Sequence, residues 1–223
     1  MESCQRDIRD ELVTETGLLF PVAIVVDSSG EMGGYDPEGV EEAVNAFFSR
    51  VAGQPDADAL VEVCVYEAYD EVVFLGGPGK ASDFMLDELR YGGEWSLADA
   101  VAEAMQSLVD YATLLDCNGR IHATPLIVAI SDTVVPDELG TFEQLDYVVA
   151  NARDRRLTVP DCVFVSTRAS NCFADHLPRV YFNQATRDTI VECMIQIANR
   201  VAGVVRPVQW VDTWGILSER SAK

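Results

Sequence analysis

Basic residues and histidines are scarce in this sequence. Lys and Arg number 16 against 37 Asp and Glu, which gives a formal net charge of −21 at pH 7, and His122 and His176 are the only histidines. Such an excess of negative charge disfavours nucleic acid or an anionic membrane surface as a partner, and it favours cations or basic protein surfaces. The same charge would also simply keep the protein in solution, so composition alone leaves both interpretations open.

Long apolar runs and a secretion signal are also missing. No stretch reaches the roughly 20 apolar residues that a membrane-spanning helix needs. The first 17 residues are polar and acidic, without the basic and apolar regions of a signal peptide. We therefore expect a cytoplasmic protein.

Common catalytic and cofactor motifs are absent too. None of the six cysteines forms a C-x-x-C pair, which argues against a zinc ribbon or a redox dithiol, and we expect reduced thiols with Cys64 and Cys162 buried. The glycines at 30, 33 and 34 are not followed by the Lys-Ser/Thr of a phosphate-binding loop, and no G-x-S-x-G elbow occurs. We therefore expect a non-enzymatic protein.

Two apolar runs, at residues 20–26 and 125–131, each stop at an aspartate. The first is followed by Asp27 and the second by Asp132. Short apolar runs closed by polar residues are typical of strands buried on both faces, as in parallel sheets covered by helices. In such sheets the loops at the carboxyl ends of the strands form the ligand site. If the two strands are neighbours, both carboxylates enter one crevice.

Strand-like and helix-like patterns alternate along the rest of the chain. They predict a doubly wound α/β domain, with a six-stranded, mostly parallel sheet, one antiparallel edge strand and helices on both faces. Residues 1–16 are predicted to be a polar extension, 17–203 the domain, and 204–223 a tail whose Trp210 and Trp214 pack on it. Further strands are predicted at residues 59–66, 71–75, 126–130, 159–165 and 180–182, a loop at 76–79, and helices at 37–52, 97–115, 142–152 and 185–202.

The two aspartates admit two interpretations. With the hydroxyl of Ser29, Asp27 and Asp132 could hold Mg²⁺, or Ca²⁺ or Mn²⁺, because hard cations prefer carboxylate and hydroxyl oxygens. Alternatively, both carboxylates accept hydrogen bonds from loop amides and from the helices that begin nearby.

The order of these motifs resembles a von Willebrand factor type A domain. The resemblance covers about residues 17–203 and rests on the D-x-S loop at Asp27 and Ser29, the G-G-x-x-x-L segment at 92–97, and Asp132 after a buried strand. It implies a doubly wound sheet with a metal-ion-dependent adhesion site at its top. Among family members, the layout looks most like the small bacterial tellurium-resistance-associated domains, which implies a stress-response setting.

The family's metal site has a D-x-S-x-S loop, a Thr in a second loop and an Asp after the fourth strand. Here Glu31 stands at the second Ser position, and the Thr position falls on Trp95, or on Ser96 if the loop is one residue longer. The resemblance therefore implies a partly degenerate site that includes Glu31 and Ser96.

These observations lead to a protein–protein interaction module whose partner binds at the top of the sheet. The resemblance implies that the metal's open position takes a carboxylate from the partner. Without a metal, the same face would bind through Met32, Tyr35 and Trp95. The alternative is a metal-dependent phosphoester hydrolase that uses the cleft between Asp27 and Asp132.

Overall fold

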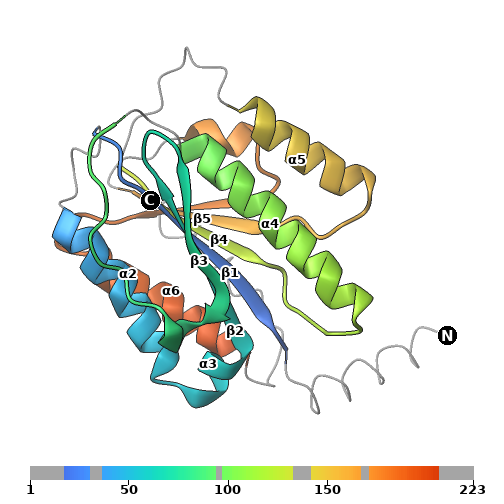
Figure 1. Ribbon diagram of the computed structural model, residues 1–223, viewed down its shortest axis with the longest axis horizontal. Coiled ribbons are helices and arrows are strands. Elements are labelled where there is room, and N and C mark those ends of the chain that lie inside the picture. Colours follow the sequence, from blue (N-terminus) through green and yellow to red (C-terminus); the bar gives the residue numbers. More distant parts are fainter. Residues whose placement is uncertain (1–17, 31–36, 94–96, 133–141, 167–170, 206–223) are drawn as a thin grey trace, which may run out of the picture.

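The computed structural model describes residues 18–30, 37–93, 97–132, 142–166 and 171–205. These residues form strands, α-helices and two short 3₁₀ helices, labelled as in Figure 1. In chain order they are β1 (Phe20–Asp27), α2 (Pro37–Ala52), α3 (Pro55–Leu60), β2 (Val61–Ala68), β3 (Val72–Lys80), η1 (Ala81–Asp83), α4 (Leu97–Cys117), β4 (Leu126–Ile130), α5 (Glu143–Asp154), β5 (Asp161–Ser166), η2 (Asn171–Asp175), β6 (Val180–Gln184) and α6 (Ile190–Val204).

The strands form one six-stranded sheet in the order β3-β2-β1-β4-β5-β6. Strand β3 runs antiparallel to β2, and all other pairs are parallel. Strand β1 lies between β2 and β4, with Val26 opposite both Glu67 and Ile130. The predicted fold class is therefore confirmed, and strand order reverses between β1 and β4, where ligand crevices form in such sheets.

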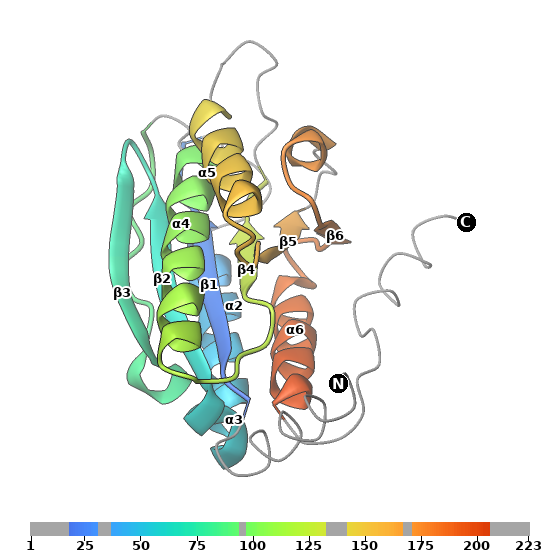
Figure 2. The same ribbon diagram turned by 90° about the vertical axis from the view of Figure 1, so that its right-hand side faces the viewer.

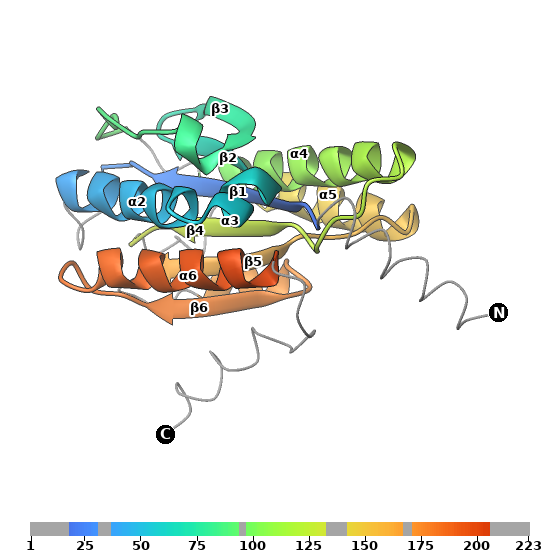
Figure 3. The same cartoon turned by 90° about the horizontal axis from the view of Figure 1, so that it is seen from below.

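Helices cover both faces of the sheet. Helices α2, α3 and α6 lie on one face and α4 and α5 on the other, as Figures 2 and 3 show from two directions. Because successive strand residues point to opposite faces, Val22, Ile24 and Val26 of β1 join the core beneath α2 and α6, whereas Ala23 and Val25 join the core beneath α4. Strand β1 is thus buried on both faces, as its continuous apolar run predicts.

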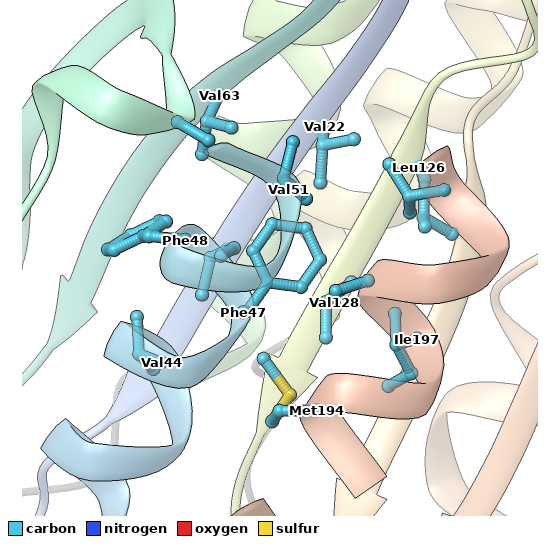
Figure 4. Close-up of a cluster of buried hydrophobic side chains, with 14 of the residues drawn as sticks. Val22, Val44, Phe47, Phe48, Val51, Val63, Leu126, Val128, Met194 and Ile197 are labelled. Carbon is cyan, nitrogen blue, oxygen red and sulfur yellow. The ribbon is translucent and has the colours of Figure 1, made fainter. Parts of the chain in front are cut away.

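The core beneath α2 and α6 is centred on fully buried side chains from both helices. Phe47 of α2 belongs to the same buried cluster as the strand residues Val22 and Val128 and the α6 residues Met194 and Ile197, and all five lie near one another in Figure 4. This packing fixes the helix that follows the first loop onto the two strands that carry the candidate site.

The edge of the sheet differs from the prediction in two places. Residues 76–79, predicted as a loop, belong to β3, and residues 55–60, of which the last two were predicted as strand, form the short helix α3. Strand β3 pairs with β2 through register shifts on either side of Val65, and Gly77–Pro78 is a cis peptide. Glycine and proline are tolerated here because β3 is an edge strand with bulges.

The structure also bears on the cysteines, on membrane-spanning helices and on the domain limits that the sequence predicts. Cys64 and Cys162 are buried free thiols, as predicted, whereas Cys117 is exposed. Among the described residues, no helix is long and apolar enough to cross a bilayer. The extension and the tail tryptophans lie outside the described residues, so the predicted domain limits stay predictions.

Candidate functional site

Asp27 lies at the end of β1 and is fully buried. The register that places Val26 beside Ile130 brings Asp27 next to Ser131, whose hydroxyl donates to Asp27 Oδ2 over 2.6 Å. The backbone N–H of Ser29 donates to Asp27 Oδ1 over 3.0 Å. A hydroxyl–oxygen distance this short is typical of a bond to an ionised carboxylate. The side chain of Asp27 thus joins the ends of two neighbouring parallel strands.

Asp132 follows Ser131 directly and is also fully buried, and Ser29 is 1% exposed. Strands β1 and β4 are neighbours and parallel, so both aspartates belong to the same end of the sheet. The adjacency on which the sequence argument rests is therefore present in the structure. That Asp27, Ser29 and Asp132 bind a metal stays a prediction.

A third buried acid lies at the same end and was missed at the sequence level. Glu67, near the end of β2, is 2% exposed, although the sequence predicts that this strand ends at residue 66. Its Oε1 accepts the hydroxyl of Ser28 over 3.0 Å and the backbone N–H of Arg90 over 2.6 Å. The signal was available in the alternation of Val61, Val63 and Val65, because Glu67 continues it on the same buried face.

Two loops meet at this end of the sheet. The N–H of Gly92 donates to the carbonyl of Ser28 over 3.2 Å, and the N–H of Gly30 donates to the carbonyl of Gly93 over 3.3 Å. Gly93 has φ +73°, and a Cβ at this position would lie 2.3 Å from Asp70 Oδ1. Any other residue would be strained by the positive φ and would force the Asp70 side chain to move. We call residues 28–30, 90–93 and 131–132 the carboxyl-end face.

Five of the candidate residues lie outside the described residues. In the chain, two of them follow Gly30 closely and two follow Gly93 closely, so both loops continue from the carboxyl-end face. These five residues are Glu31, Met32, Tyr35, Trp95 and Ser96.

The donor set at this face suits a hard cation in part. Asp27, Asp132 and Ser29 supply the oxygen ligands that Mg²⁺ and Ca²⁺ prefer. Within the described ranges, however, no group of three or more His, Cys, Asp and Glu residues could hold a metal ion. The bonds from Ser29 and Ser131 to Asp27 agree with the alternative interpretation, in which hydrogen bonds satisfy the carboxylate. A complete site would need Glu31 and Ser96.

Each histidine contacts other parts of the fold. His122, before β4 at the opposite end of the sheet, has Nδ1 2.8 Å from the carbonyl of Ala123. His176 stacks on Phe142 with a centroid distance of 4.1 Å, and its Nδ1 lies 2.7 Å from Asp146 Oδ1. These contacts suit structural roles, and the absence of enzymatic activity stays a prediction.

Comparison with known proteins identifies the fold. No family model and no curated protein matches the sequence. Among solved structures, the PilB minor pilin from Streptococcus sanguinis aligns with a TM-score of 0.59 at 10% identity, over 88% of this chain and 64% of that one. A von Willebrand factor type A protein from Catenulispora acidiphila aligns with a TM-score of 0.56 at 14% identity, over 83% and 43%.

A third similar structure is the ArnB paralog VWA2 from Sulfolobus acidocaldarius, with a TM-score of 0.52 at 13% identity, over 81% of this chain and 46% of that one. This chain therefore spans less than two thirds of each of these three proteins. At such identities the likeness concerns the fold alone. The chain has a von Willebrand A-like fold, and the expected resemblance is confirmed at that level.

Proposed function

We propose that this chain is a non-enzymatic protein-interaction module that binds its partner at the carboxyl-end face. The observation that carries the proposal is the junction of β1 and β4, where buried Asp27 accepts the hydroxyl of Ser131 and buried Asp132 follows. Buried carboxylates are costly unless bonds or a cation compensate them, and here they gather where doubly wound sheets bind ligands. Similar folds in a minor pilin and a pilus adhesin support an interaction role in general terms.

The proposal includes a cation at this face, Mg²⁺ or alternatively Ca²⁺ or Mn²⁺. Asp27, Ser29 and Asp132 would hold it together with Glu31 and Ser96. The bound cation would supply an open position for a carboxylate of the partner. In its absence, Met32, Tyr35 and Trp95 would make the contacts. The resemblance to tellurium-resistance-associated domains extends the proposal to a cytoplasmic role in a bacterial stress system.

Capture of the partner tests the location of the binding face. The full chain is immobilised and exposed to host lysate, and bound proteins are quantified by mass spectrometry for wild type, Trp95→Ala and Leu114→Ala. Leu114 is the matched control because it is a 54% exposed apolar residue in the last turn of α4, at the opposite end of the sheet. We expect one captured protein to be lost only with Trp95→Ala. Equal capture by all three proteins would contradict a site at the carboxyl-end face.

Calorimetric titration with Mg²⁺, Mn²⁺ and Ca²⁺ tests the cation. Binding that Asp27→Ala abolishes and Asp110→Ala retains would support it, since Asp110 is an exposed aspartate on α4. No heat with any of the three cations would remove the metal from the proposal and leave the interaction module. Turnover of a generic phosphoester that Asp132→Ala abolishes would instead favour the metal-dependent hydrolase.

A further inference from the structure

Residues 84–93, which we call the strap, form no helix or strand and run from η1 to the carboxyl-end face. Side chains of α2 and β2 hold the strap by its backbone. Asn45 forms two hydrogen bonds with the backbone of Leu86: its Oδ1 accepts the N–H of Leu86 over 2.8 Å, and its Nδ2 donates to the carbonyl of Leu86 over 2.7 Å. Glu41 Oε1 accepts the N–H of Leu89 over 2.9 Å. Each of these two side chains joins the strap to α2.

Glu67 differs from these two residues because it bonds to both loops of the carboxyl-end face. The same oxygen, Oε1, accepts the N–H of Arg90 from the strap and the hydroxyl of Ser28 from the loop after β1. Glu67 is 2% exposed and Ser28 fully buried, so water does not compete freely for these bonds. Bonds to an ionised acceptor are about twice as strong as those between neutral groups.

The backbone contacts between the two loops are longer than the bond from Arg90 to Glu67. The bonds from Gly92 to Ser28 and from Gly30 to Gly93 measure 3.2 and 3.3 Å, near the long end of the usual range. The bond from Arg90 to Glu67 measures 2.6 Å. Glu67 therefore adds a buried carboxylate acceptor, shared by both loops, to this backbone pair.

We propose that Glu67 is a positioning residue for the carboxyl-end face. It holds together the starting points of the loop that continues to Glu31 and Met32 and of the loop that continues to Trp95 and Ser96. This role rests on the proposed function, because a fixed spacing of the loops matters only if both loops bind one partner. Pre-organised loops lose less conformational entropy on binding.

Hydrogen exchange of single backbone amides, followed by NMR on the full chain without ligand, tests the positioning directly. In Glu67→Ala we expect the amides of Gly30, Arg90 and Gly92 to exchange faster by about 10-fold or more, the factor expected for the loss of bonds to a charged acceptor. Glu67→Gln keeps an oxygen that accepts both bonds but lacks the charge, so its exchange rates should lie between those of Glu67→Ala and the wild type. If Glu67 only supported global stability, its loss would speed exchange equally at the amide of Val128 in the central strand β4.

Asn45→Ala is the matched control, because it releases the strap at Leu86 but keeps Glu67. We expect faster exchange at Leu86 and unchanged exchange at Gly30. If Glu67→Ala does not fold, Ser28→Ala removes the other end of the bridge and should speed exchange at Gly30 and Gly92.

Unchanged exchange at Gly30 and Gly92 in the folded variant would overturn the proposal, whatever the partner experiment shows. Faster exchange there with no loss of partner capture in Glu67→Ala would overturn the functional part alone. Faster exchange together with reduced capture, both restored in part by Glu67→Gln, is the result that we expect.

Discussion

Replacement of Ser131 by alanine measures what the junction of β1 and β4 contributes to stability. The variant deletes a 2.6 Å bond between a hydroxyl that is 4% exposed and a carboxylate that is fully buried. A bond to a charged group contributes about 1.5–3 kcal/mol, and a buried acceptor that loses its donor keeps its desolvation cost. We therefore expect the free energy of unfolding to fall by about 2 kcal/mol and Tm to fall by about 4 to 8 °C.

The chain offers a matched control for this variant. Ser82 Oγ donates to Asp58 Oδ2 over 2.8 Å, the same pair of groups at an exposed position. Water replaces that bond when it is lost, so Ser82→Ala should cost less than about 0.5 kcal/mol. Both variants are unfolded in urea at constant pH and followed by circular dichroism. Equal losses of stability in the two variants would refute the argument that burial makes the Asp27–Ser131 bond strong.

Two further predictions concern a glycine and a thiol. Gly119 has φ +67° with open space around it, so Gly119→Ala should lower the free energy of unfolding in urea by about 1–2 kcal/mol. Gly93→Ala should lower it more, because its Cβ would lie 2.3 Å from Asp70 Oδ1. Equal losses in the two variants would contradict this close approach. Burial, with a smaller contribution from the charge of Glu62, raises the pKa of the Cys64 thiol from 9.0 to about 11, so iodoacetamide at pH 8 should alkylate exposed Cys117 and spare Cys64 in the folded protein, as read by mass spectrometry. A Cys64 that reacts as fast as Cys117 would contradict its burial. As pH rises, the thiol ionises in the unfolded protein before it ionises in the folded one. Its contribution to stability is therefore full below about pH 9 and is lost as pH rises through 11.

The centre of the fold could be predicted from the sequence, whereas the edge could not. Strands β1 and β4 are buried on both faces, so their sequences are continuous apolar runs that end where the strands end. Strand β3 pairs on one side only, and its Gly76–Gly79 segment reads locally as a turn. Its strand conformation comes from pairing with β2, a tertiary effect that local propensity does not contain.

The candidate site also has one part that the sequence predicts and one part that it does not. The location of Asp27 and Asp132 at the same end of neighbouring strands follows from the two apolar runs and from the strand order of doubly wound sheets, so it could be predicted. Glu67 could not be recognised as readily, because a buried glutamate is tolerable only where donors satisfy it, and its donors come from Ser28 and Arg90, 39 and 23 residues away in the sequence. A charged residue at a strand end looks like a solvated turn until those distant donors are known.

The end of β1 is attached to both neighbouring strands, on opposite faces of the sheet. Asp27 continues the face of Ala23 and Val25, beside α4, and there it meets Ser131 after β4. Ser28 turns to the other face, beside α2, and meets Glu67 of β2. Because successive residues point to opposite faces, one short segment makes both attachments. The two contacts lie on opposite faces and share no side chain. The segment on which the proposed binding face is built is therefore attached from both faces of the sheet.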